Sequence, residues 1–176
     1  VPQKTDFETD FTAEEIVMTG RTPYQGRFEG TSIGDKEAVY RAFSLTKADK
    51  LKDKKFAILS GGEKQKIVIA RAVAQTTPWM LLDEPIASLD IKNQIEIMQT
   101  LSELNRQEGV SVLMVLHDIN LAGIYCDRLI MLKDGQVIAA GNTNECLCEE
   151  NLKKLYDISF FHMDTKKGQR YYYAEI

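Results

Sequence analysis

Two acidic residues, Asp83 and Glu84, follow the apolar run WMLL and precede Pro85. A short apolar run that ends in polar residues is typical of a buried strand of a parallel sheet. Open α/β sheets bind ligands at the carboxyl ends of their strands, where these carboxylates are expected. One carboxylate there can hold a magnesium ion, and the other can orient or deprotonate an attacking water. The alternative is that either acid only caps the next helix.

A histidine and a second polar segment are expected near the same edge. His117 ends another apolar run, VSVLMVL, so it would lie at the carboxyl end of a second strand. A histidine beside a carboxylate pair can sense the γ-phosphate of a nucleotide, although a single histidine is more often structural. The segment from Ser88 to Asp90 can turn the chain toward a partner surface. Alternatively, it provides the N-cap of a helix that begins at Ile91.

The stretch LSGGE puts two glycines into the first turn of a predicted helix. Ser60 and Glu63 have the spacing of a capping box, in which each side chain binds the other residue's backbone N–H. Capping does not account for Gly61 and Gly62, each of which costs a helix up to about 1 kcal/mol relative to alanine. A helix N-terminus binds anions through its N–H groups and dipole, and glycine leaves room for a phosphate. The glycines therefore predict phosphate binding, with capping alone as the alternative.

The first half of the chain is predicted to be helical. Thr12 begins a short helix with a T-x-x-E pattern, and residues 32–45 have apolar side chains at helical spacing. The charged connector TKADKLKDKKF separates that helix from the one beginning near Ser60 and is interpreted as a solvated surface. We therefore expect helices over roughly residues 12–76.

After Pro78 the pattern changes to strands. Two short apolar runs flank a crossover helix over residues 91–105, which predicts a β-α-β unit with strands buried on both faces. Asp134-Gly135 predicts the turn of a β-hairpin. Helices are expected over residues 143–156, and the aromatic tail is expected to add a strand.

Composition limits the classes of function. The 176 residues are 44% apolar and 27% charged, which indicates a globular protein of one domain or two subdomains. The net charge of −4 argues against nucleic acid or anionic lipid as a partner. No apolar run approaches the roughly 18 residues that span a bilayer. Three cysteines without zinc-type spacing favour reduced thiols.

Taken together and in order, these motifs resemble the nucleotide-binding subunit of ATP-binding cassette (ABC) transporters. LSGGE is similar to the family's signature motif, WMLLDEP to its Walker B strand with the catalytic glutamate, SLD to its D-loop and LHD to its switch histidine. VPQ at the start is similar to the end of the Q-loop strand, which would make Gln3 the Q-loop glutamine.

The resemblance implies an α/β fold with a P-loop NTPase-like (ABC ATPase) parallel-sheet core and an α-helical subdomain. Residues 1–77 would hold the end of the Q-loop, the helical subdomain and the signature helix. Residues 78–142 would form the ATPase core, and residues 143–176 the C-terminal helices and tail.

The resemblance also implies how ATP would be bound, between two subunits arranged head to tail as a homodimer. Glu84 and His117 would be catalytic, while Asp83 and Gln3 would hold Mg²⁺. The residues implied to contact the nucleotide are Gln3, Ser60, Gly61, Gly62, Glu63 and Asp90.

MTGRTPY and the region from LHD to AAG are most similar to importers of iron–siderophore complexes, haem or cobalamin. This implies a membrane-spanning permease as partner and a location at the cytoplasmic face of the cell membrane. Tyr24 and Phe28 would contact the permease, with ordinary packing of loop aromatics as the alternative.

One feature departs from the family. No G-x-x-x-x-G-K-[ST] motif occurs, and the P-loop is expected before Gln3. We therefore expect a sheet core without its N-terminal part, supplying only the trans half of an ATP site and inactive by itself. The Walker B strand would lack its P-loop neighbour, leaving an apolar edge that self-association or rearrangement would cover.

Two other classes of function remain open. A non-transport ABC ATPase of DNA repair or chromosome organisation would have a long coiled coil between Q-loop and signature. Gln3 and Ser60 are only 57 positions apart, without sustained heptads, which disfavours this class. The second class is a non-enzymatic, truncated interaction module. No nucleic-acid partner is expected.

Overall fold

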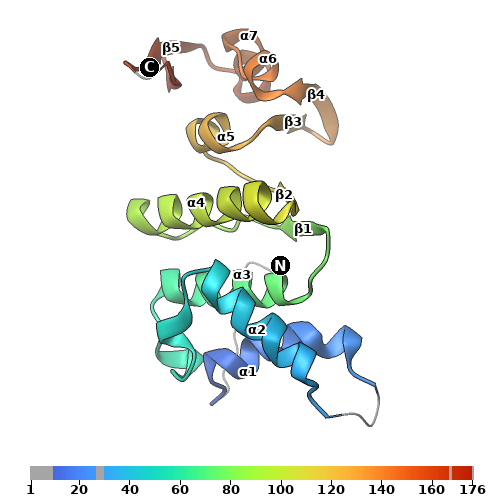
Figure 1. The fold of residues 1–176 in the computed structure, drawn as a ribbon. Coiled ribbons are helices and arrows are strands. Elements are labelled where there is room, and N and C mark those ends of the chain that lie inside the picture. The colour runs from blue at the N-terminus through green and yellow to red at the C-terminus, as the bar shows by residue number, and fades with distance from the viewer. Residues whose placement is uncertain (1–9, 27–29, 167, 176) are drawn as a thin grey trace. The chain divides into compact units, whose positions relative to one another are not determined.

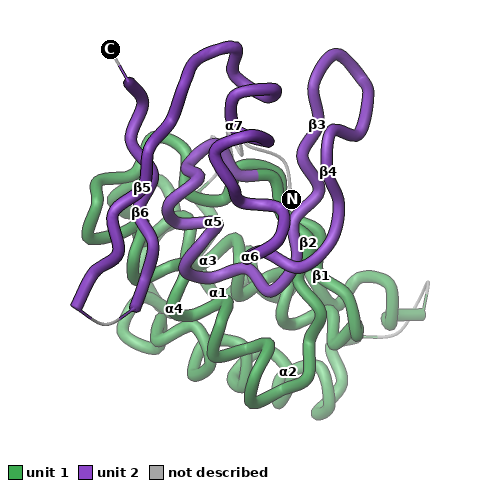
Figure 2. Tube along the Cα trace, turned by 90° about the horizontal axis from the view of Figure 1, so that it is seen from above, with its two compact units in different colours: residues 1–115 green, residues 116–176 purple. Residues whose placement is uncertain are grey.

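The computed structural model describes residues 10–26, 30–166 and 168–175. Its contacts divide the chain into two compact units, residues 1–115 and 116–176, coloured green and purple in Figure 2. The predicted boundaries at residues 77 and 142 fall inside these units and stay a prediction.

The first part of unit 1 is helical, as expected (Figure 1). Thr12, Ser32 and Ser60 each form a complete capping box at the start of a helix, so the three predicted helix starts are confirmed. The helical elements are α1 (Ala13–Met18), η1 (Thr19–Tyr24), α2 (Ile33–Leu45), η2 (Asp49–Leu51), η3 (Phe56–Ile58) and α3 (Gly61–Ala74).

An apolar core joins these helices. α1 contributes Ile16 and Val17, α2 contributes Phe43, and α3 contributes Ile67 and Ala70, all of them almost completely buried. The apolar side predicted for α2 therefore packs in the same core as the apolar side of α3.

A β-α-β unit follows, confirming the predicted crossover. Its elements are β1 (Trp79–Leu82), α4 (Ile91–Glu108) and β2 (Ser111–Met114). β1 pairs with β2 in parallel, with Leu82 opposite Met114, and the N–H of Val115 continues the ladder to the Leu82 carbonyl at 3.0 Å. The carboxyl ends of both strands therefore meet at one edge.

The expectation that both faces of these strands are buried is wrong. Met80 and Leu82 are buried, but Trp79 is 60% exposed and Leu81 is 62% exposed. Successive side chains of a strand point to opposite faces, and a single crossover helix covers only one of them. Among the described residues β1 pairs with β2 alone, so the predicted open strand edge is present. Its covering by self-association or rearrangement stays a prediction.

Ion pairs connect the helices to α4. Lys47 lies 2.8 Å from Glu103, and Lys66 lies 2.7 Å from Glu96. Arg41 pairs with Glu108 near the end of α4. Pairs as exposed as Lys47–Glu103 contribute little stability each.

Unit 2 contains the predicted hairpin, which turns at Asp134-Gly135 with φ values of 50° and 74°. Both values lie in the left-handed region that such two-residue turns require. The elements are α5 (Ile119–Tyr125), β3 (Arg128–Lys133), β4 (Gln136–Asn142), α6 (Thr143–Cys146), α7 (Glu149–Tyr156), β5 (Phe160–Asp164) and β6 (Arg170–Ala174).

The C-terminal tail forms two strands where one was expected. β5 and β6 pair as an antiparallel hairpin, with His162 opposite Tyr172. Tyr172 is buried together with Leu147 and Leu152, and Asn120 exchanges two hydrogen bonds with its backbone at 2.8 and 3.2 Å. The aromatic tail is therefore part of the core of unit 2.

No helix in the described part of the chain is both long and apolar enough to cross a bilayer.

Asp35 has an electrostatic role at the start of α2. Its carboxylate accepts hydrogen bonds from the Arg21 side chain at 2.9 Å and from the N–H and hydroxyl of Ser32 at 3.0 and 2.8 Å. The bond from Arg21, followed by those from Ser32, lowers the pKa of Asp35 below its ordinary 3.8. Folding therefore favours the ionised carboxylate.

This lowered pKa predicts how stability depends on pH. Around pH 4 the unfolded chain binds more protons at Asp35 than the folded chain, so this contribution is complete above about pH 5 and is lost as pH falls through the folded-state pKa. We expect Asp35→Asn to be less stable than the wild type at neutral pH, with the difference narrowing below about pH 4. Urea unfolding across pH measures this.

The exposed Asp53→Asn substitution is the control, because it leaves the Arg21–Asp35 pair intact. A difference between wild type and Asp35→Asn that stays constant down to about pH 3 would contradict the role given to Asp35.

Candidate functional site

β1 delivers the acid pair to the carboxyl edge of the sheet. Asp83 is exposed and Glu84 partly buried, directly after the last strand residue. The chain then turns, with the Ala87 N–H donating to the Glu84 carbonyl at 3.2 Å, while Pro85 and Ile86 are buried. The buried pair anchors the turn directly after the two acidic residues.

Glu84 has an unusual backbone conformation that sequence reasoning missed. Its φ is 45°, in the left-handed region, and Ser88 four residues later also has a positive φ of 63°. Such conformations cost a non-glycine residue about 1–3 kcal/mol and concentrate at functional sites. The strain at Glu84 supports a functional role for this turn, and no sequence pattern signals it.

Asp90 is the N-cap of α4, as the structural alternative predicted. Its carboxylate accepts hydrogen bonds from the backbone N–H of Asn93 at 2.9 Å and from the Asn93 side-chain amide at 2.6 Å. These bonds lower the pKa of Asp90 from its ordinary value. A contact between Asp90 and a nucleotide stays a prediction.

At the tip of α3, Ser60 and Glu63 form the expected capping box. The Ser60 N–H donates to the Glu63 carboxylate at 2.9 Å, and the Glu63 N–H donates to the Ser60 hydroxyl at 3.3 Å. The Ser60 bonds lower the pKa of Glu63 from its ordinary value. The box involves the N–H groups of Ser60 and Glu63 only. Those of Gly61 and Gly62 lie in the first turn, where an α-helix offers no internal acceptor.

The two glycines have different neighbours. A Cβ on Gly62 would stand 2.2 Å from Oδ1 of Asn93, whereas a Cβ on Gly61 would meet nothing closer than Leu89, at 3.7 Å. Packing against α4 therefore explains Gly62 without any ligand. Only Gly61 leaves room at the helix tip, so the sequence argument for phosphate binding holds for one glycine of the two.

Asn93 brings two of the predicted motifs together. It contacts Gly62 at the tip of α3 and is held by Asp90 at the start of α4. The signature-like tip and the segment after the acid pair are thus neighbours within unit 1. Sequence reasoning did not single out Asn93, and a pair of residues 31 positions apart has no local signal.

The structure does not give the positions of two predicted site residues relative to the other site residues. His117 belongs to unit 2, so its grouping with Asp83 and Glu84 stays a prediction. Gln3 lies outside the described residues. Among the described residues, no group of three or more His, Cys, Asp or Glu side chains could hold a metal ion. A Mg²⁺ site here would need phosphate oxygens and waters beside one or two carboxylates, which is how proteins commonly bind this ion.

The contact between Gly62 and Asn93 predicts that a larger residue at position 62 destabilises the fold. Gly62→Ala should displace Asn93 from Asp90 and lower the free energy of unfolding by about 1–3 kcal/mol, because the new methyl group overlaps a restrained side chain. Urea unfolding followed by circular dichroism measures the change.

Gly61→Ala is the matched control and should be neutral or stabilising, since alanine favours a helix and its methyl group has room here. Adding Asn93→Ala to Gly62→Ala should recover most of the loss. Equal destabilisation by the two glycine substitutions would show that Asn93 is not the constraint.

Comparison with known proteins finds similarity to ABC transporters. Residues 1–87 match the family model described as ABC transporter. The chain is 40% identical to the ferric enterobactin transport ATP-binding protein of Escherichia coli (strain K12), over 88% of this chain and 57% of that protein. It is 39% identical to the petrobactin import ATP-binding protein of Bacillus anthracis, over 90% of this chain and 58% of that protein.

A solved structure agrees with these matches. The chain superimposes on a putative metal-chelate type ABC transporter in an inward-facing conformation with a TM-score of 0.93 and 26% identity. The superposition covers all of this chain and 71% of the transporter chain. The chain spans less than two thirds of the length of the two curated relatives. The α/β, P-loop NTPase-like fold with an added helical part is confirmed, and residues 1–87 belong to the family described as ABC transporter.

Proposed function

We propose that the chain is part of the ATP-hydrolysing subunit of an ABC importer that takes up an iron complex, haem or cobalamin. The observation that carries this proposal is the acid pair in its strained turn at the carboxyl edge of a parallel sheet, next to a segment that contacts the tip of α3. Relatives named for ferric enterobactin transport and petrobactin import support the iron–siderophore class.

The tip of α3 would bind a γ-phosphate presented by a second subunit. By helix geometry the N–H groups of Gly61 and Gly62 have no intrahelical acceptor, and the positive end of the helix dipole lies there. Ser60 holds the first turn in place through its bonds with Glu63. This arrangement fits the head-to-tail homodimer in which one subunit's tip faces the nucleotide of the other.

The carboxylates would divide the work at the sheet edge. Asp83, exposed beyond β1, would hold Mg²⁺, which neutralises phosphate charge when bound. Glu84 would polarise the attacking water, and its partial burial favours a defined orientation. His117 would hold the γ-phosphate and the water in line, and Gln3 would connect the metal to the permease-facing helices.

The permease would be the membrane-spanning partner and would hold the subunit at the cytoplasmic face of the cell membrane. ATP binding would close the dimer and hydrolysis would reopen it. The driving force is the difference in ATP affinity between the open and closed states. Tyr24 is 51% exposed and would meet the permease, whereas its hydroxyl is already bonded to the Gln75 carbonyl. Phe28, the second expected contact, lies outside the described residues.

The purified 176-residue chain should hydrolyse ATP negligibly by itself. Its sequence contains no G-x-x-x-x-G-K-[ST] motif, so it lacks the lysine and backbone cradle that bind the β- and γ-phosphates in this class. Magnesium-dependent phosphate release measures this, with Glu84→Gln as the background control. Robust turnover that Glu84→Gln abolishes would contradict the expectation.

In a complete subunit that carries a P-loop, Glu84→Gln should retain ATP binding and lose turnover by about 10²–10⁴-fold, because only the water-activating carboxylate is removed. Equilibrium binding and steady-state hydrolysis give the two quantities. Glu103→Gln, on the exposed side of α4, is the control and should leave both unchanged. Near-normal turnover of the Glu84 variant would remove this residue from the proposed role.

A further inference from the structure

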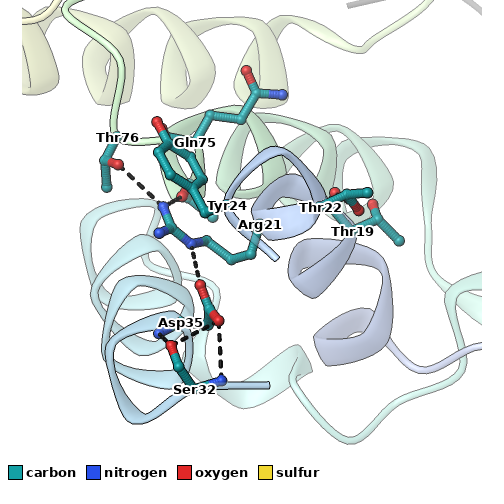
Figure 3. Close-up of polar contacts among 9 residues, drawn as sticks. Thr19, Arg21, Thr22, Tyr24, Ser32, Asp35, Gln75 and Thr76 are labelled. Carbon is teal, nitrogen blue, oxygen red and sulfur yellow. Dashed lines mark hydrogen bonds and ion pairs between the residues drawn. The ribbon is translucent and has the colours of Figure 1, made fainter. Parts of the chain in front are cut away.

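The segment η1 is attached to the last turn of α3 by one buried arginine (Figure 3). Arg21 is 9% exposed, and its Nη1 donates to the Ala74 carbonyl at 2.7 Å and to the Thr76 hydroxyl at 3.1 Å. Its Nε donates to Asp35 at the start of α2, at 2.9 Å. One side chain thus joins three elements.

Two neighbours of Arg21 strengthen the attachment. The Tyr24 ring stacks on the guanidinium, with 4.0 Å from Arg21 Cζ to the ring centroid, and the Tyr24 hydroxyl donates to the Gln75 carbonyl at 2.6 Å. At Gly20 the backbones of η1 and α3 approach so closely that a Cβ on this residue would stand 2.3 Å from the Arg71 carbonyl oxygen. We call Gly20, Arg21 and Tyr24 the η1 clasp.

The chemistry of the clasp suits a helix C-terminus. The last carbonyl groups of an α-helix have no intrahelical donor, and a cation beside them is favourable to the helix dipole. The planar guanidinium can donate to Ala74 and Asp35 at once in a fixed geometry, which the single ammonium of lysine cannot reproduce. Arginine is therefore required if η1, α2 and α3 are to keep one mutual orientation.

We propose that Arg21 is a positioning residue that makes η1 and α3 move as one body. α3 has 14 residues, so its tip at Ser60–Gly62 lies about 20 Å from the clasp along a rigid helix. A displacement of η1 is then transmitted to the tip. This inference rests on the proposed function, in which a permease meets η1 at Tyr24; the neighbouring Thr22 and Pro23 are exposed as well.

The first experiment tests the clasp in the 176-residue chain by hydrogen exchange. In Arg21→Gln, amides of residues 19–26 and of the end of α3 should exchange at least about tenfold faster, while those of the first turns of α3 should not change. Arg41→Gln, which removes only an exposed ion pair with Glu108, should match the wild type. Unchanged exchange in Arg21→Gln would overturn the proposal.

Tyr24→Phe keeps the proposal testable if Arg21→Gln does not fold. It removes only the hydroxyl bonded to Gln75, and should accelerate exchange in the same segments by a smaller factor. Wild-type exchange in Tyr24→Phe, with an unfolded Arg21→Gln, would show that Arg21 serves stability alone and would overturn the proposal.

The second experiment tests transmission in the complete subunit assembled with its permease. The ratio of permease-stimulated to basal ATP hydrolysis should fall about tenfold in Arg21→Gln, with the basal rate kept within about twofold, since coupling free energies commonly correspond to 5–150-fold effects. Arg21→Lys should not restore the ratio. An equal fall in basal and stimulated rates, or an unchanged ratio, would overturn transmission through Arg21.

The two experiments separate the possible failures. If the wild-type complex shows no stimulation by any permease, the importer assignment is refuted. The exchange experiment then still decides whether Arg21 joins η1 to α3.

Discussion

The arrangement of unit 1 depends on the close approach of α3 to the start of α4. Gly62 has no space for a side chain because Asn93 fills it, and Asn93 is held there by Asp90. A bulkier residue at position 62 would separate the two helices or release Asn93 from its cap. The tip of α3, for which phosphate binding is proposed, is therefore next to the segment that follows the acid pair.

The C-terminal end of α3 is held by hydrogen bonds and an ion pair. Arg21 and Tyr24 bind the carbonyls of Ala74 and Gln75, and Asp35 neutralises the buried guanidinium. α3 is therefore held at its N-terminus by the packing of Gly62 against Asn93 and at its C-terminus by hydrogen bonds. Its apolar middle packs on α1 and α2. An element held in this way moves as a unit, because bending it would break contacts at one end or the other.

Local features of the fold could be predicted because their causes are local. The capping boxes at Thr12 and Ser60 depend on residues three positions apart, and the turn at Asp134-Gly135 depends on two residues that tolerate a positive φ. The structure of the C-terminal tail was harder to predict, because its aromatic sequence does not show where the chain turns to form a hairpin. Its pairing as β5 and β6 depends on the burial of Tyr172 among residues of α6 and α7.

By itself the sequence determined the order of the main elements before the tail, the resemblance to ABC transporters and the positions of the acid pair and the two glycines, since spacing along the chain records all of these. Only the tertiary structure decided which face of β1 is covered, which side chain lies against Gly62 and where Arg21 donates its hydrogen bonds. These features arise from residues tens of positions apart, such as Gly62 with Asn93 and Arg21 with Ala74. Contacts of that range are set by packing, for which no local pattern exists.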